Sequence, residues 1–156
     1  MRALSVVVAL VALVAAQACS GGAEHGRPAA SAIKFSKLVR SLAKRGFAPV
    51  VEAGFDGRSW NVVALRDGTP VQLTVNPTVG HLGKVRALAD TKHEVPPADG
   101  RPLWQIAEQL EQAGYTPILE VEFEDGKWEI EALAPVELDV DPGTGEVLQS
   151  ELDVDD

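Results

Sequence analysis

Cysteine and histidine are scarce in this chain of 156 residues. Cys19 is the only cysteine, so no disulfide can form within the chain and the folded state depends on the packing of apolar side chains. The histidines are His25, His81 and His93, and none has a second metal ligand two to four residues farther along the chain. Because zinc needs three or four ligands, the sequence predicts loop histidines, no metal site and no cofactor.

Motifs for catalysis are also missing from the sequence. No serine stands in a nucleophile elbow, and no glycine-rich loop with a lysine is present that could hold a phosphate. Residues 139–143 begin like a calcium-binding loop, but Gly143 has no side-chain oxygen at the fifth position and Ser150 stands at the twelfth, where such a loop needs a glutamate. We interpret that segment as a turn. The sequence therefore predicts a protein that is not an enzyme, with no catalytic residue.

Long apolar runs are confined to the N-terminus. After Met1 and Arg2, residues 3–16 carry no charge, and they lead into the small-x-small cleavage signal Ala16-Gln17-Ala18. This pattern is typical of a secretory signal peptide, and the run is shorter than the roughly 20 residues of a transmembrane helix. We predict a signal peptide over residues 1–18, followed by export to the periplasm or the cell envelope.

Cys19 directly follows the predicted cleavage site, and two interpretations remain open. In the first, Cys19 becomes the lipid-bearing first residue of a bacterial lipoprotein and attaches the chain to a membrane, although Ala16 stands where that signal prefers leucine. In the second, ordinary cleavage releases a soluble protein with a free thiol. Residues 19–30 are rich in glycine, alanine and proline, so they are predicted to form a flexible linker.

The remainder of the chain contains an internal repeat. Its matching segments are residues 46–52 (GFAPVVE) with 114–120 (GYTPILE), Trp60 with Trp128, and residues 71–77 (VQLTVNP) with 136–142 (VELDVDP). The first two matches are separated by the same number of residues, and the separation of the third match is three residues smaller. A repeat of this length is a small domain rather than a solenoid unit.

The residue pattern of each half predicts one helix followed by an antiparallel meander. Apolar residues recur at helical spacing before Gly46, and alternating strands follow that are separated by Asp-Gly turns. The predicted fold is α+β, with two tandem modules at residues 31–90 and 102–153 and a linker at 91–101. Each module has one helix packed on a three- to four-stranded antiparallel sheet. Since such a unit is marginal alone, we expect the modules to pack together or to share a sheet edge.

The second half contains a Gly-aromatic pair at residues 114–115, an acidic strand leading into a Trp-bearing strand at 122–132 (EFEDGKWEIEA), and the ending 140–147 (VDPGTGEV). With these motifs, residues 98–153 resemble the PepSY family, and residues 32–90 resemble a degenerate copy. The resemblance implies an extracytoplasmic module without catalytic residues. In secreted metalloproteases, such domains lie in the propeptide and inhibit the enzyme.

Charge divides the chain sharply. Residues 19–97 carry a net charge of +5, whereas residues 98–156 carry −15. Facing like charges weaken a sheet, so the second sheet holds more acid than stability alone would select. The predicted outward carboxylates are Glu120, Glu122, Glu124, Glu129, Glu131, Glu137 and Asp139.

These carboxylates can be interpreted as a solvated surface without a binding role, or as a surface with one of two functions. The first is a non-catalytic module that binds an unknown protein partner, such as an envelope or secreted peptidase, through the acidic residues. The alternative is a cation-binding or metal-responsive envelope protein that uses the same sheet. Trp60 and Trp128 are predicted to fill the core, whereas Trp104 flanks the apolar stripe and is a candidate contact residue. Nucleic acid is an improbable partner for an exported acidic protein.

Overall fold

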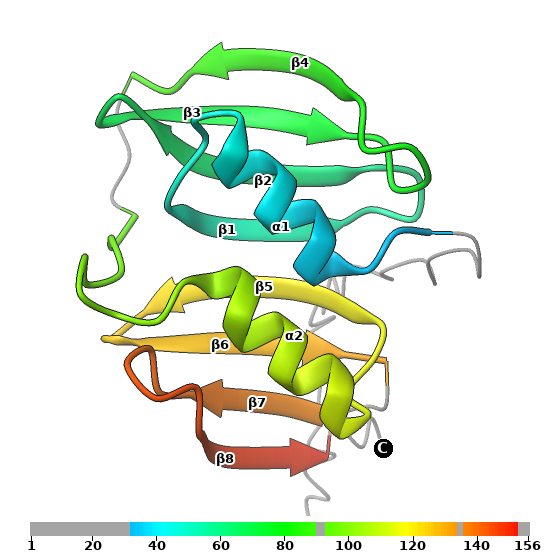
Figure 1. Cartoon of the computed structure of the whole chain (residues 1–156), viewed down its shortest axis with the longest axis vertical. Coiled ribbons are helices and arrows are strands. Elements are labelled where there is room, and N and C mark those ends of the chain that lie inside the picture. Colours follow the sequence, from blue (N-terminus) through cyan, green and yellow to red (C-terminus); the bar gives the residue numbers. More distant parts are fainter. Residues whose placement is uncertain (1–31, 90–92, 134–135, 153–156) are drawn as a thin grey trace, which may run out of the picture.

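The computed structural model describes residues 32–89, 93–133 and 136–152 (Figure 1). The predicted signal peptide, Cys19 and the linker over residues 19–30 lie outside these ranges. Across the described ranges, no helix has both the length and the apolar character needed to cross a membrane.

One helix followed by four strands occurs twice along the chain. The strands form one eight-stranded antiparallel sheet in the order β4-β3-β2-β1-β5-β6-β7-β8. The α+β class is therefore confirmed, but the two halves share a continuous sheet and do not have two separate ones. The elements are α1 (Phe35–Lys44), β1 (Val50–Phe55), β2 (Trp60–Arg66), β3 (Thr69–Val75), β4 (Leu82–Ala87), α2 (Leu103–Ala113), β5 (Ile118–Glu124), β6 (Lys127–Ala132), β7 (Val136–Val140) and β8 (Val147–Leu152).

Both helices lie on the same face of the sheet and enclose the core against it (Figure 1). Trp60 and Trp128 are buried there, with 2% and 1% of their surface exposed, which confirms their predicted inward orientation. Each tryptophan packs on the phenylalanine opposite it in the hairpin: the ring centroids of Phe55 and Trp60 are 5.5 Å apart, and those of Phe123 and Trp128 are 5.1 Å apart. Such aromatic pairs add both buried area and specific geometry to the core.

Strands β1 and β5 join the two halves through a short antiparallel pairing. Ala53 pairs with Val121 at its centre, and Glu52 pairs with Glu122 beside it. The shared sheet edge expected from the sequence is thus present at this seam. Because side chains alternate between the two faces of a strand, the seam places both carboxyl groups on the face away from the helices.

The helices are also linked by a buried polar contact. The backbone N–H and the hydroxyl of Ser36, in the first turn of α1, donate hydrogen bonds of 3.1 and 2.6 Å to the carboxylate of Glu111 near the end of α2. A carboxylate at a helix N-terminus satisfies backbone donors and interacts favourably with the helix dipole. This contact fixes the two helices relative to each other.

Candidate functional site

The face of the sheet that the helices leave uncovered carries the predicted acidic residues. Their strand register places them side by side in two rows, one containing Glu122, Glu129 and Asp139 and the other Glu120, Glu131 and Glu137. Glu124 and Glu137 are exposed, and the others are half-buried. Their role in binding a partner stays a prediction. We call this set the acidic face: Glu120, Glu122, Glu124, Glu129, Glu131, Glu137 and Asp139.

Lys127 lies at one end of the acidic face and offsets part of its charge. Its Nζ atom is 2.9 Å from a carboxylate oxygen of Glu129 and 2.7 Å from one of Asp139. The hydrogen bond to Asp139, and then the bond to Glu129, raise the pKa of Lys127 well above its ordinary value. Lys127 therefore offsets the negative charges of Glu129 and Asp139 in the first row.

A hollow of about 380 Å³ lies in the middle of the acidic face. The residues that line it include the apolar Leu119, Ala132, Leu133 and Val136. The remaining lining residues include carboxylates from both rows of the acidic face. A hollow with acidic and apolar lining residues can receive a short segment that has one apolar side chain between basic ones.

The turn that precedes β8 uses Asp141 in a structural role. One carboxylate oxygen of Asp141 accepts bonds from the backbone N–H groups of Gly143 and Thr144, at 2.9 and 2.7 Å. The N–H of Thr144, together with its hydroxyl group, lowers the pKa of Asp141 below its usual value. These contacts support the sequence interpretation of this segment as a turn.

Trp104 stands at the beginning of α2, half-buried beside α1. The guanidinium of Arg40 lies 4.7 Å from the centre of its ring, which is a cation–π distance. Trp104 also lines an apolar groove of about 450 Å³ that includes Phe47, Pro97 and Leu103. The groove is on the helix side of the molecule, so Trp104 is separate from the acidic face.

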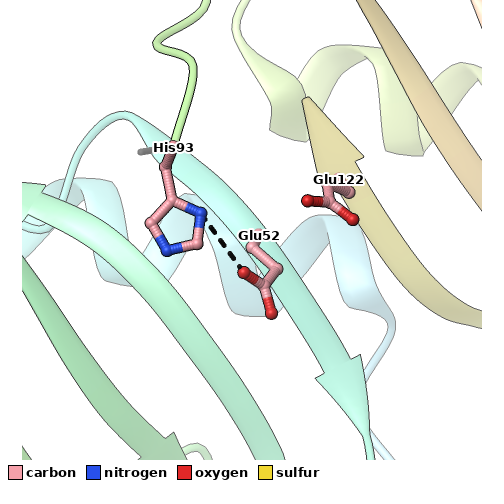
Figure 2. Close-up of side chains that lie close together, drawn as sticks. All are labelled: Glu52, His93 and Glu122. Atoms are coloured by element: carbon pink, nitrogen blue, oxygen red, sulfur yellow. Dashed lines mark ion pairs between the residues drawn. The ribbon is translucent and has the colours of Figure 1, made fainter. Parts of the chain in front are cut away.

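A cluster that the sequence analysis missed lies at the seam between the halves. Figure 2 shows Glu52 on β1, Glu122 on β5 and His93, from the segment before α2, converging on the helix-free side. Nδ1 of His93 is 3.4 Å from a carboxylate oxygen of Glu52, and one ligand atom from each of the three residues lies within 4.8 Å of the others. Sequence spacing gave no signal for this cluster, because its members come from three distant segments.

Comparison with protein families confirms the resemblance for the second half of the chain. Residues 81–151 match the family described as peptidase propeptide and YPEB domain, PepSY_2. The match extends from the beginning of β4 to β8 and includes the acidic face.

The chain was also compared with solved structures and with curated proteins. Among solved structures, a candidate lipoprotein from Clostridium difficile 630 is similar at 14% sequence identity and a TM-score of 0.43, and the similarity covers 74% of this chain and 89% of that one. A comparison with curated proteins found no match.

Proposed function

We propose that this chain, whose residues 81–151 form a PepSY-type domain, is a non-catalytic, exported binding module of the peptidase-propeptide kind. Its binding surface is the acidic face, and its partner is a peptidase of the cell envelope or the exterior that presents a basic segment. The observation that carries the proposal is the register of β5, β6 and β7, which brings carboxylates together in two adjoining rows.

The electrostatics of the acidic face support a basic partner. Carboxylates that face each other across strands repel, so the arrangement weakens the isolated sheet and becomes favourable when cations approach it. A surface of one charge sign also steers an oppositely charged partner and increases its association rate. The apolar residues among those that line the hollow, such as Leu119 and Leu133, add a position where one buried side chain of the partner can anchor the complex.

Export is supported by the N-terminal sequence and by the family. Residues 1–18 have the composition of a signal peptide, and the matched family is named for domains of peptidase propeptides. We propose an envelope or secreted location, with lipid attachment through Cys19 as the mode of anchoring. Replacement of Cys19 by alanine should then move the protein from the membrane fraction to the soluble fraction.

We also propose that residues 32–90 are a degenerate copy of the matched domain. Contacts recur at the offset of the sequence repeat: Phe55 pairs with Trp60 as Phe123 pairs with Trp128. The N–H of Leu65 donates to the carbonyl of Pro49 at 2.9 Å, and Leu133 and Pro117 repeat that bond at the same distance. The first half would then extend the sheet and complete the core of the second half.

The proposal is tested by mixing the full-length protein with secreted metallopeptidases and measuring both hydrolysis of a fluorogenic peptide and affinity by calorimetry. We expect inhibition by one or more of these enzymes, with an affinity that falls as NaCl is raised. The double variant Glu131→Gln, Glu137→Gln should bind about tenfold more weakly or worse, which corresponds to a loss of about 1.4 kcal/mol.

Glu108→Gln is the matched control, because Glu108 is exposed on α2 and lies on the opposite side of the sheet. It should leave affinity unchanged. Binding that is insensitive to salt and to the double variant would show that the acidic face is not the binding surface. A protein that inhibits and binds none of these enzymes would contradict the assignment of a peptidase as partner.

A further inference from the structure

We infer that Glu52, His93 and Glu122 form a binding site for a divalent transition-metal cation such as Zn²⁺. The three side chains converge at the β1–β5 seam, each from a different segment of the chain (Figure 2). This inference goes beyond the proposed binding of a peptidase and does not depend on it.

The donor atoms select the class of cation. The cluster offers one imidazole nitrogen and two carboxylate oxygens, a mixed set that suits zinc and related first-row metals. Calcium and magnesium take oxygen ligands almost exclusively, so the histidine argues against them. A tetrahedral zinc ion held by three side chains keeps a fourth position for water.

The distances suit such an ion. Ligand atoms that bind one zinc at about 2.0–2.2 Å lie about 3.3–3.6 Å from each other in tetrahedral geometry. Nδ1 of His93 and the carboxylate oxygen of Glu52 are already separated by 3.4 Å. The atoms of the cluster, Glu122 included, all lie within 4.8 Å of one another. In the proposed site, the half-buried Glu122 side chain moves closer to complete the triad.

The negative charge around the cluster favours the binding of a cation. Glu52 and Glu122 are directly opposite in the β1–β5 register, and Glu122 is in turn opposite Glu129. Lys127 compensates Glu129, but among the described residues no hydrogen bond or ion pair is made by Glu122. Adjacent carboxylates repel across strands, and a bound divalent cation would convert this repulsion into attraction.

The segment that carries His93 is held in place independently of any metal. The carboxylate of its neighbour Glu94 accepts a hydrogen bond of 3.2 Å from the backbone N–H of Gly126, in the turn between β5 and β6. His93 is thereby kept close to the seam, with 28% of its side chain exposed. A metal at this position would fasten the segment between β4 and α2 to strands from both halves.

The experiment measures Zn²⁺ binding to the full-length protein by competition with a chromophoric chelator. The chain is given the substitutions Cys19→Ser and His25→Ala, so that His81 and His93 are its remaining nitrogen or sulfur side-chain ligands of the usual kind. We expect one Zn²⁺ per chain and a rise in the thermal unfolding midpoint on adding Zn²⁺. His93→Ala and Glu122→Gln should each weaken binding tenfold or more and abolish that rise.

Two matched controls separate the cluster from the rest of the surface. His81→Ala removes an exposed histidine near a turn, and Glu108→Gln removes an exposed carboxylate on α2, on the opposite side of the sheet; both variants should bind as the parent does. Circular dichroism without metal checks that every variant is folded. The inference is overturned if no stoichiometric binding occurs, if His93→Ala binds as tightly as the parent, or if Ca²⁺ stabilises as strongly as Zn²⁺.

Discussion

The two halves of the chain share a helix-facing surface and differ on the opposite one. At the helix-facing positions, Phe55 and Trp60 in the first half correspond to Phe123 and Trp128 in the second. On the uncovered face, Glu52 of the first half corresponds to Glu120 of the second, so one carboxylate is common to both. The other corresponding positions hold Gly54, Asn61, Val63, Gln72 and Thr74 in the first half, and Glu122, Glu129, Glu131, Glu137 and Asp139 in the second.

This difference separates what packing requires from what function uses. A core position tolerates few side chains, because a change of volume there costs several kcal/mol. A position on an open sheet face accepts most polar residues at little cost. Most carboxylates of this face therefore lie on the second half without being required by the fold, which agrees with our proposal that the second half binds a partner there.

The largest expected effect tests the shared core. Trp60→Ala and Trp128→Ala should each lower the free energy of unfolding by about 3–5 kcal/mol, since both create a cavity in the same helix–sheet layer. Urea unfolding followed by circular dichroism measures the loss. Because the halves share one sheet, we expect a single transition in every variant.

Trp104→Ala provides the comparison for the two core tryptophans, because its side chain is only half-buried and should cost less. Two separate unfolding transitions, or an effect at one core tryptophan alone, would show that the halves are stabilised independently.

The next effect concerns the contact between the helices. Glu111→Ala removes the acceptor of two bonds from Ser36 and leaves donors at the start of α1 unsatisfied. We expect a loss of about 1–3 kcal/mol, the range for leaving a buried hydrogen-bond donor unsatisfied. Urea unfolding checks this, with Glu108→Ala as the exposed control on the same helix. Equal losses in the two variants would rule out a specific role for Glu111.

A smaller effect, of opposite sign, is expected on the acidic face. Glu137 is opposite Glu131 on one side and Glu151 on the other, so Glu137→Gln should raise the free energy of unfolding by about 0.2–1 kcal/mol. The gain should shrink at about 1 M NaCl, where charges are screened within about 3 Å. Unfolding curves at low and high salt measure both effects.

The reverse substitution at the equivalent position of the first half, Gln72→Glu, provides a comparison for Glu137→Gln. Gln72 accepts a hydrogen bond from Arg86 at 2.8 Å, so Gln72→Glu would place the new carboxylate beside a guanidinium and should not destabilise the sheet. A Glu137→Gln variant that is less stable than the parent at low salt would contradict the view that the acidic face is strained by repulsion.

The smallest expected effect concerns two turns that have matching hydrogen bonds, with an amide as the acceptor in one and a carboxylate in the other. Asn76 accepts bonds from the N–H groups of Thr78 and Val79, as Asp141 does from Gly143 and Thr144. The N–H of Thr144 lowers the pKa of Asp141 in the folded state, so its charged form stabilises that state. This contribution is complete above the unfolded-state pKa of about 3.9 and is lost as pH falls through the lower folded pKa.

Asp141→Asn should therefore be slightly less stable than the parent at neutral pH, and the difference should close in acid. Urea midpoints measured from about pH 7 down to about pH 2 follow the difference across the titration of the carboxyl group. Asn76→Asp is the reverse change and should gain stability at neutral pH only. A constant difference between Asp141→Asn and the parent at every pH would show that the charge of Asp141 plays no part.

Local patterns in the sequence predicted the elements and most of their boundaries. Helical spacing and a following glycine located both helices, since Gly46 and Gly114 have φ values of +83° and +99° that favour a residue without Cβ. The Asp-Gly pairs predicted tight hairpins, and Asp67 and Asp125 indeed have positive φ. These signals are reliable because they depend on residues close together in the chain.

Of the candidate sites, the acidic face was predicted from the sequence and the cluster of Glu52, His93 and Glu122 was not. Alternation along β5, β6 and β7 was enough to place the acidic residues on one face. It gave no signal for the pairing of Ser36 with Glu111 or for the approach of His93 to Glu52, because periodicity within a segment carries no information about a partner in another segment. The sequence prediction of isolated loop histidines rested on local spacing alone, and for His93 it missed two neighbouring carboxylates.

The sequence by itself determined the order of helices and strands, the composition of the core and the charge of the second half, because short-range periodicity, turn chemistry and residue type fix these properties. Only the tertiary structure decided that the two sets of strands form one sheet and that Glu52, His93 and Glu122 meet. The physical reason is that the β1–β5 hydrogen bonds use backbone N–H and C=O groups, which every residue except proline possesses. The choice of partner strand therefore depends on how the two cores pack together.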